Sequence, residues 1–264
     1  MKKIGFQFLI TLVLFFGTLL VLQQIDWIKL FEVERISKKT ENKLGDLYWE
    51  FIKKMNHEVK SERIREPVQK LVDVLVKAND IDSEIKLHVV KKDDVNAFAL
   101  PNGHLVVYTG LIESCKNPEE LCGVLGHEIA HIDKNHVMKK LVKEVGLSAL
   151  LSIASGKGGE IFKETAKNLT SSAYDRSLET EADLTSVGYL QEAQLDPRPF
   201  ADFLKRMAKA ENGMPDQMFW LSTHPDSEKR ANAILEEISS GKTESIKVMP
   251  DSVWAGLKEK CQSN

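Results

Sequence analysis

A histidine–glutamate–histidine cluster near the middle of the chain carries the clearest chemical signal. His127, Glu128 and His131 form the pattern H-E-x-x-H, and residues four apart lie on the same face of a helix. Both imidazoles can therefore bind one metal ion, and zinc lowers the pKa of a bound water to about 7. Glu128 lies close enough to take a proton from such a water. The spacing predicts a catalytic zinc site with its own general base.

The residues around this cluster predict a regular helix that would hold it rigidly. Asn117 is a favourable N-cap, Pro118 suits the first helical position, and Glu120 stands three residues after the cap. Apolar side chains then recur at helical spacing, at Leu121, Leu125, Ile129 and Ile132. Both histidines are therefore expected in the middle of a helix, where the backbone fixes their positions.

A catalytic zinc site also needs a third protein ligand and one open position. His136 is nine residues after His127, whereas the pattern H-E-x-x-H-x-x-G-x-x-H puts its third histidine at ten, so we interpret His136 as a structural residue or a partner of a ligand histidine. Glu179 and Asp183 are four apart and share a helix face, while Glu181 points elsewhere on such a helix. One carboxylate of the pair can bind the metal and the other can orient a ligand histidine. A solvated acidic helix face is the alternative.

Five ordered motifs resemble the zinc metallopeptidases of family M48, the HtpX and CAAX prenyl protease type. Within that family the chain is most similar to the short bacterial branch, which has one membrane anchor and a soluble catalytic domain. The resemblance covers roughly residues 62–240 and departs mildly at Asn102, where the family usually has glycine. The motifs lie at 96–104, at 107–111, at 126–131 with His136, at Arg176 with 179–183, and at 223–225 with Arg230.

The resemblance implies a role for each residue of the cluster. His127, His131 and Glu179 match the zinc ligands of the family, and Glu128 matches its general base. Asp183 matches an acid that supports a ligand histidine. One Zn²⁺ per chain is therefore implied.

Two residues further along the chain keep more than one interpretation. By resemblance, His224 and Arg230 stabilise the oxyanion or contact the substrate, and His224 could also fill the fourth zinc position in a resting state. His224 followed by Pro225 can instead mark only the start of a helix.

The segment before the zinc helix predicts short strands at 86–90, 95–100 and 104–108, separated by turn residues. Zinc peptidases of this kind commonly hold the substrate as a strand added to the edge of a sheet. From the sequence alone the second segment is only a strand-like run of small and apolar residues. By resemblance, the substrate-binding edge would consist of Asn96, Ala97, Phe98 and Ala99.

The first residues predict a membrane segment. Lys2 and Lys3 precede an uncharged apolar run at 4–22, which at about 1.5 Å per residue is just long enough to cross a bilayer core. No small-x-small cleavage motif follows the run, which favours an uncleaved anchor over a secretory signal peptide. The lysines favour a cytoplasmic amino terminus. The sequence therefore predicts a single-pass, membrane-anchored protein whose catalytic domain is periplasmic or otherwise extracytoplasmic.

Length and composition predict one large catalytic domain. Of the 264 residues 42% are hydrophobic, which is ordinary for a globular protein, and the net charge of −3 suggests no nucleic-acid partner. Cys115 and Cys122 could pair or remain buried thiols. Helical patterns dominate, so we expect an α+β fold, a mainly helical, gluzincin-like zincin domain with a small sheet. The expected divisions are a membrane anchor at 1–24, a helical linker at 25–61, the zinc metallopeptidase domain at 62–240 and a C-terminal tail at 241–264.

Together these observations predict a zinc-dependent endopeptidase. Glu128 would deprotonate a water that attacks a peptide carbonyl, and would then pass the proton to the leaving amine. By resemblance, the polypeptide substrates are unfolded or damaged envelope proteins, and the process is protein quality control. A latent or chaperone-like, membrane-tethered binder of misfolded proteins is the alternative, and a metal hydrolase with a non-peptide substrate is a third.

Overall fold

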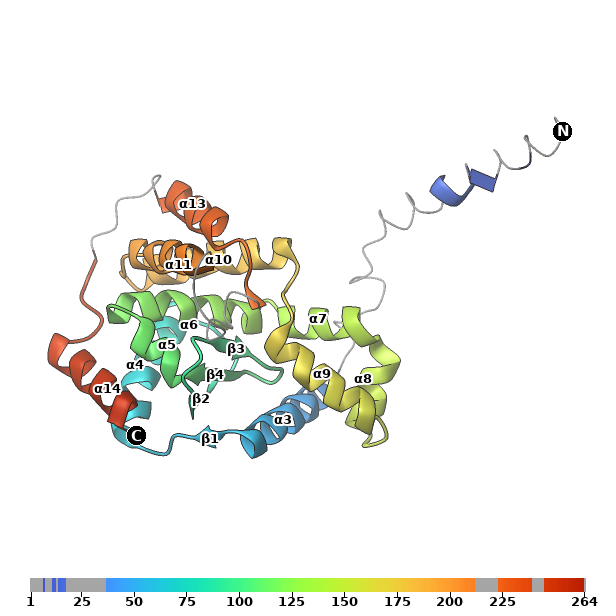
Figure 1. Ribbon diagram of the computed structural model, residues 1–264, viewed down its shortest axis with the longest axis horizontal. Helices are drawn as coiled ribbons and strands as arrows, with labels where there is room; N and C mark the ends of the chain where they lie inside the picture. The colour runs from blue at the N-terminus through green and yellow to red at the C-terminus, as the bar shows by residue number, and fades with distance from the viewer. Residues whose placement is uncertain are drawn as a thin grey trace. The chain divides into compact units, whose positions relative to one another are not determined.

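The computed structural model describes residues 7, 11–12, 14–17, 37–211, 223–238 and 245–263. The chain divides into two units, Met1–Ser37 and Lys38–Asn264. In the first unit, residues 7, 11–12 and 14–17 are helical. The described part of the second unit is mainly helical with one small sheet, so that the predicted α+β class is confirmed (Figure 1).

All strands of the sheet lie among the first elements of the second unit, and the described elements after β4 are helices. In chain order the elements are α3 Lys38–Met55, β1 His57–Glu58, α4 Glu62–Ala78, β2 Lys86–Lys91, β3 Ala97–Ala99, β4 His104–Tyr108, α5 Thr109–Ser114, α6 Pro118–Asp133, α7 His136–Val145, α8 Leu147–Ala154, α9 Gly159–Ser171, α10 Arg176–Glu192, α11 Arg198–Glu211, α13 Ser227–Ile238 and α14 Asp251–Ser263. The H-E-x-x-H pattern lies inside α6, as predicted.

The sheet has the strand order β1-β2-β4-β3. β2 and β4 are parallel, with Lys86 opposite His104, whereas β3 pairs antiparallel with β4, with Ala97 opposite Val107. β3 is therefore an outermost strand of the sheet and contacts α6. The strands expected at 86–90, 95–100 and 104–108 are all present.

Helix α6 is the central element of the second unit. Its start is capped as the sequence predicts, because the Asn117 side chain accepts a hydrogen bond of 2.8 Å from the Glu120 backbone N–H. Every residue from 120 to 132 is buried, since α6 packs against α10 and α11 on one side and against α4 and β3 on the other (Figure 1). The two histidines of the pattern are thus held inside the protein on a rigid helix.

Helix α3 is tied to the sheet by a chain of polar contacts. His88 Nδ1 lies 3.2 Å from Glu58 Oε1, His88 Nε2 lies 2.8 Å from His104 Nδ1, and His104 Nε2 lies 3.1 Å from Asp46 Oδ1. The Trp49 ring stacks on His88 with 3.6 Å between ring centroids. Each of the three contacts needs one hydrogen, but two neutral imidazoles supply only two N–H groups. While both imidazoles are neutral, one of the three contacts therefore lacks a hydrogen.

The three cysteines, Cys115, Cys122 and Cys261, are free and buried. Burial raises the pKa of the Cys115 and Cys122 thiols far above its usual value, which keeps them protonated and unreactive. Of the two alternatives that the sequence left open for this pair, buried thiols are found.

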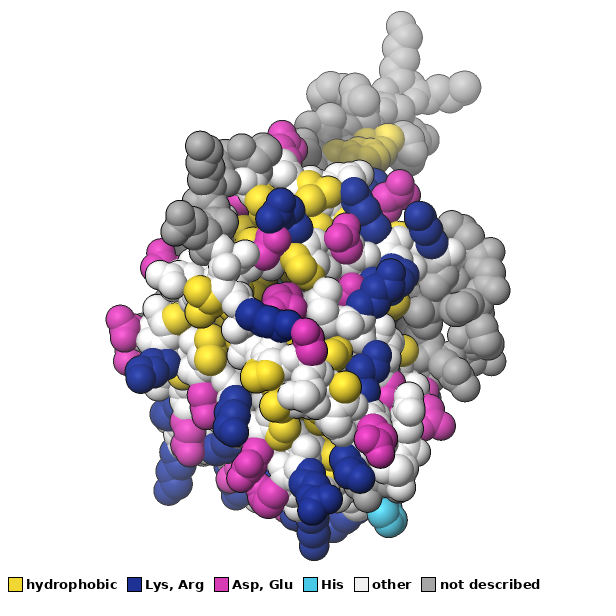
Figure 2. Space-filling view, turned by 90° about the vertical axis from the view of Figure 1, so that its left-hand side faces the viewer, with side chains coloured by type: hydrophobic (Ala, Val, Ile, Leu, Met, Phe, Trp, Pro, Cys, Tyr) yellow, Lys and Arg dark blue, Asp and Glu magenta, His cyan; other side chains and the backbone are white. Residues whose placement is uncertain are grey.

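The surface drawn in Figure 2 mixes charges of both signs. Basic and acidic side chains are interspersed on this face, and hydrophobic side chains form small separate groups. The mixture agrees with a chain of 36 Lys and Arg and 39 Asp and Glu residues. The described part of this face therefore presents no large field of a single sign.

The predicted single-pass membrane location is corrected by the structure. A helix that spans a bilayer needs about 20 mainly apolar residues, and no helix among the described residues is long and apolar enough to cross a membrane. Most of the apolar run at 4–22 lies outside the described residues, as do parts of the predicted linker at 25–61 and tail at 241–264. The anchor and the extracytoplasmic location inferred from it are therefore not supported, and the predicted domain limits stay predictions.

We expect Gly123→Ala to destabilise the protein, because α6 and α11 meet at this residue. A Cβ atom at position 123 would overlap the Cβ and ring atoms of Phe200, and forced overlap in a packed core costs about 1–3 kcal/mol. Gly188→Ala in α10 is the matched control, since no described atom lies within 4 Å of its added Cβ. The free energy of unfolding of Gly188→Ala should rise by about 0.5–1 kcal/mol, because alanine has the higher helix propensity. Urea unfolding measures both changes, and a stable Gly123→Ala protein would contradict the packing described for α6.

We expect the free energy of unfolding to fall as the pH is lowered from about 6.5 to about 4, in part through His88. Burial lowers the pKa of His88 to about 4, against an ordinary value of 6.5. The unfolded state therefore binds more protons within this window, and each such proton favours unfolding by up to about 1.4 kcal/mol per pH unit. Urea unfolding across this range should show a flatter dependence for His88→Gln than for the exposed control His57→Gln. Equal slopes for the two variants would show that His88 contributes nothing to the pH dependence of stability.

Candidate metal centre

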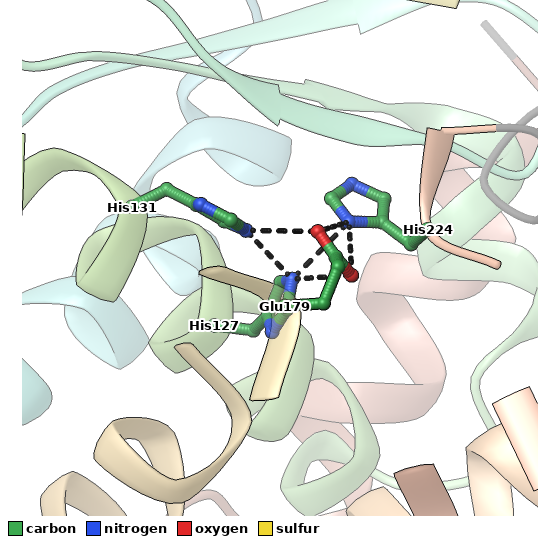
Figure 3. Close-up of side chains that lie close together, drawn as sticks. All are labelled: His127, His131, Glu179 and His224. Carbon is green, nitrogen blue, oxygen red and sulfur yellow. Dashed lines mark hydrogen bonds and ion pairs between the residues drawn. The ribbon is translucent and has the colours of Figure 1, made fainter. Parts of the chain in front are cut away.

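Four side chains from three segments converge at one buried point (Figure 3). His127 and His131 come from α6, Glu179 comes from α10, and His224 comes from the residues just before α13. One ligand atom of each lies within 4.8 Å of the others, and all four side chains are buried. The structure thus brings together the three residues predicted as zinc ligands and His224, which the resemblance offered as a fourth donor.

The distances among these atoms suit a single cation. His131 Nε2 lies 3.0 Å from His127 Nε2 and 3.3 Å from Glu179 Oε1. His224 Nδ1 lies 3.2 Å from His127 Nε2 and 3.0 Å from both oxygens of Glu179. Zinc bonds of about 2.0–2.2 Å place neighbouring tetrahedral donors about 3.3–3.5 Å apart. A set of imidazoles and one carboxylate at these separations fits Zn²⁺.

Glu128 lies beside the cluster with its carboxylate available. Its side chain is fully buried, and neither oxygen accepts a hydrogen bond from the described residues. His224 Nε2 lies 3.3 Å from Oε1. Burial opposes ionisation, but attraction to His224, His127 and His131 prevails, so that the pKa of the Glu128 carboxyl lies below its usual value. A buried carboxylate without hydrogen bonds is costly unless it faces a cation or water, which fits a proton acceptor beside a metal.

Asp183 and Arg230 support His127 from behind. Asp183 Oδ1 lies 2.9 Å from His127 Nδ1, a contact that turns Nε2 of the ring toward the cluster. Arg230 donates to both oxygens of Asp183 at 2.7 Å. Burial opposes ionisation of Asp183, but the guanidinium lowers its pKa to about 2. Asp183 therefore stands where the sequence predicted a supporting acid.

The Arg230 side chain contacts several residues of the metal centre. Besides Asp183, its Nη1 atom contacts Glu179 Oε2 at 3.0 Å and donates to the backbone oxygen of His224 at 3.1 Å. The side chain is only 5% exposed. This geometry favours a positioning role over the oxyanion or substrate contact that the resemblance implied.

His136 supports the second ligand in the same way. Its Nδ1 atom lies 3.0 Å from His131 Nδ1, and its Nε2 atom lies 3.2 Å from Glu181 Oε2. His136 thus contacts His131, and its role as a partner of a metal ligand stays a prediction. Glu181 does not join the ligand set, but it reaches His131 through His136, a link that sequence spacing gave no means of finding. Tyr174, which stacks on His131 with 4.1 Å between ring centroids, also carried no sequence signal.

The predicted substrate-binding residues lie outside the ligand set. In the antiparallel ladder Tyr108 N donates to Asn96 O at 3.0 Å and Leu100 N donates to His104 O at 2.8 Å. Residues 96, 98 and 100 therefore use their peptide groups toward β4, and the peptide groups of Ala97 and Ala99 point to the opposite side. A small pocket near the end of this strand has a lining that includes Leu100, Pro101, His131 and Ile132, but none of the other three residues of the donor set.

Residues 60–238 match the family described as Peptidase family M48. The chain is 31% identical over 158 residues to "Mitochondrial metalloendopeptidase OMA1" of Schizosaccharomyces pombe, covering 59% of this chain and 47% of that protein. It is 36% identical over 184 residues to "Metalloendopeptidase OMA1, mitochondrial" of Bos taurus, covering 62% and 35%. It is 31% identical over 170 residues to "Metalloprotease LoiP" of Escherichia coli, covering 61% and 66%. The chain thus spans between 35% and 66% of the length of these relatives.

These matches confirm the predicted class of enzyme, a zinc metalloendopeptidase. They do not confirm the narrower resemblance, because these relatives carry names other than HtpX or CAAX prenyl protease, and the single anchor of the short bacterial branch is not shown. The family match spans well over half of the chain. The chain belongs to peptidase family M48.

Proposed function

We propose that this chain hydrolyses peptide bonds within polypeptides, with His127, His131 and Glu179 as zinc ligands and Glu128 as the general base. The observation that carries the proposal is a buried carboxylate, 3.3 Å from His224 Nε2, beside a four-residue donor set. Membership of a peptidase family supports the reaction class. We further propose unfolded or damaged proteins, envelope proteins among them, as substrates in protein quality control.

The protein side of the mechanism follows from the geometry. Zinc, when bound, polarises a carbonyl and makes water a better nucleophile. Glu128 takes a proton from the attacking water and returns it to the leaving amine, and its lowered pKa keeps it ionised for the first of these transfers. Asp183 holds His127 in the orientation that directs Nε2 inward. Both proton transfers can therefore use one residue held on a buried helix.

The substrate would bind as a strand added to β3. The outward peptide groups of Ala97 and Ala99 supply a donor and an acceptor each, and main-chain pairing of this kind accepts many sequences. Both residues are buried, so this edge has to be uncovered before a substrate strand can pair with it. This arrangement favours extended, unfolded chains over small non-peptide esters.

A second candidate, a latent enzyme that holds misfolded chains without cutting them, is supported by His224. Its Nδ1 atom completes a set of four donors, and its Nε2 atom lies 3.3 Å from Glu128 Oε1. Four protein donors fill a tetrahedral zinc site, whereas a catalytic site keeps one position open. In this arrangement His224 therefore stands where the substrate carbonyl or the water would bind.

We expect Glu128→Gln to keep zinc and to lose about two to four powers of ten in rate, because the variant removes the proton acceptor but no metal ligand. Casein degradation and zinc content should be measured side by side on both proteins. His57→Gln, a change of an exposed histidine, is the control. Undiminished cleavage by zinc-loaded Glu128→Gln would reject Glu128 as the general base. Loss of zinc would show that Glu128 is a ligand.

We expect His224→Ala to cleave casein several-fold faster than the wild type, because it opens the fourth position. Zinc affinity should fall only moderately, since three donors remain. The control is again His57→Gln, with rates normalised to zinc content. A fall in kcat by about ten-fold or more would reject latency and would instead indicate that His224 stabilises the oxyanion.

A further inference from the structure

We propose that Tyr174 is a positioning residue for His131, and that it acts through the face of its ring and not through its hydroxyl. The proposal rests on the zinc site of the proposed function. Tyr174 lies between α9 and α10, two residues before α10 begins. Its ring stacks on the His131 imidazole with 4.1 Å between centroids and 23° between planes, and only 7% of the residue is exposed.

The polar contacts of His131 lie in the plane of its ring, and the stack restrains rotation of the ring about the outer side-chain torsion. Nε2 faces His127 and Glu179, and Nδ1 faces His136 at 3.0 Å. The outer torsion of a histidine side chain has a broad energy profile, so that packing has to fix the plane of the ring. A flat aromatic ring against the imidazole face supplies that restraint.

Tyr174 is itself held in place by a buried cation. Lys140 Nζ lies 4.4 Å from the centroid of the tyrosine ring and donates a hydrogen bond of 2.6 Å to the backbone oxygen of Ser172. Lys140 is 5% exposed, and the attraction between an ammonium group and an aromatic face is strongest when it is shielded from water. Lys140, on α7, thus fixes the segment 172–174 beside the metal centre.

The contacts of Tyr174 indicate that its ring, and not its hydroxyl, positions His131. None of the described residues makes a hydrogen bond to its hydroxyl, whereas the ring contacts His131, Lys140 and, with 6.0 Å between centroids, His224. Replacement by phenylalanine keeps every one of these contacts. Replacement by leucine removes the flat face and the cation site together.

The test compares Tyr174→Phe with Tyr174→Leu in the full chain. Zinc dissociation constants are measured by competition with a chromophoric chelator, and kcat and KM are measured with a casein-derived peptide. We expect the zinc affinity of Tyr174→Phe to stay within about three-fold of the wild type and that of Tyr174→Leu to fall about 10- to 100-fold, as for other residues that orient a ligand. The absorption spectrum of the Co²⁺-substituted protein should change for the leucine variant alone.

Tyr48→Leu is the matched control for loss of a buried, stacked tyrosine. Tyr48 is 0% exposed and stacks on Phe162 with 5.1 Å between centroids, but it belongs to α3 and not to the metal centre. It should lower the melting temperature without changing zinc affinity. If Tyr174→Leu fails to fold, Lys140→Met provides the second variant, with an expected loss of zinc affinity of about three- to ten-fold.

Three results would overturn the proposal. Unchanged zinc affinity in both Tyr174→Leu and Lys140→Met would show that the stack does not position His131. Equal losses in Tyr174→Leu and Tyr48→Leu would show a general effect of stability. A large loss of kcat in Tyr174→Phe at full zinc content would show that the hydroxyl, and not the ring, carries the function of Tyr174. Failure of the proposed function is a separate result, since the wild type would then bind no zinc or would bind zinc and cleave nothing.

Discussion

Charge balance in a dry interior is the constraint on which the rest of the centre depends. Glu128, Glu179 and Asp183 are all buried, and Arg230 is the buried cation that contacts the latter two. Three carboxylates and one guanidinium leave two negative charges, which a divalent cation neutralises. Burial of uncompensated charge is costly, so this set of residues favours a bound cation. The pKa of His224 shows the effect of these carboxylates: burial lowers it, but Glu179 and Glu128 raise it to about 9.

The supports of the two ligand histidines differ, and the difference follows from where each lies on α6. His127 faces α10 and α13, which supply a charged partner, Asp183, and the guanidinium of Arg230 behind it. His131 lies nearer the end of α6, where α7 turns back and supplies His136, with Tyr174 over the ring face. Fixed ligands lower the reorganisation needed when metal and substrate bind. The helix, in turn, is fixed because it is buried along nearly its whole length.

His224 joins the two proposed states of the enzyme. Its position completes the donor set, and Arg230 holds its backbone oxygen. The same arginine supports Asp183 and Glu179, so that ligand geometry and the position of His224 share one anchor. Movement of His224 away from the fourth position is therefore coupled through Arg230 to Asp183 and Glu179.

The sequence by itself determined the chemistry of α6. Asn117, Pro118 and the apolar spacing indicated the helix. His127, Glu128 and His131 predicted a pair of metal ligands with a base, because residues four apart on one helix must share a face. It also indicated Glu179 and Asp183 as a pair. Its prediction of a membrane anchor from the apolar run at 4–22 did not hold, because composition alone does not establish a spanning helix.

Only the tertiary structure decided how distant segments meet. The inclusion of His224 in the donor set, the commitment of Arg230 to Asp183 and Glu179, the link from Glu181 through His136, and the cover of Tyr174 over His131 all join residues from different elements. Local spacing fixes relations within one helix, but contacts between elements depend on how helices cross and how loops return. These contacts set ring planes, charge balance and access to the metal, and therefore decide whether the centre is open or closed.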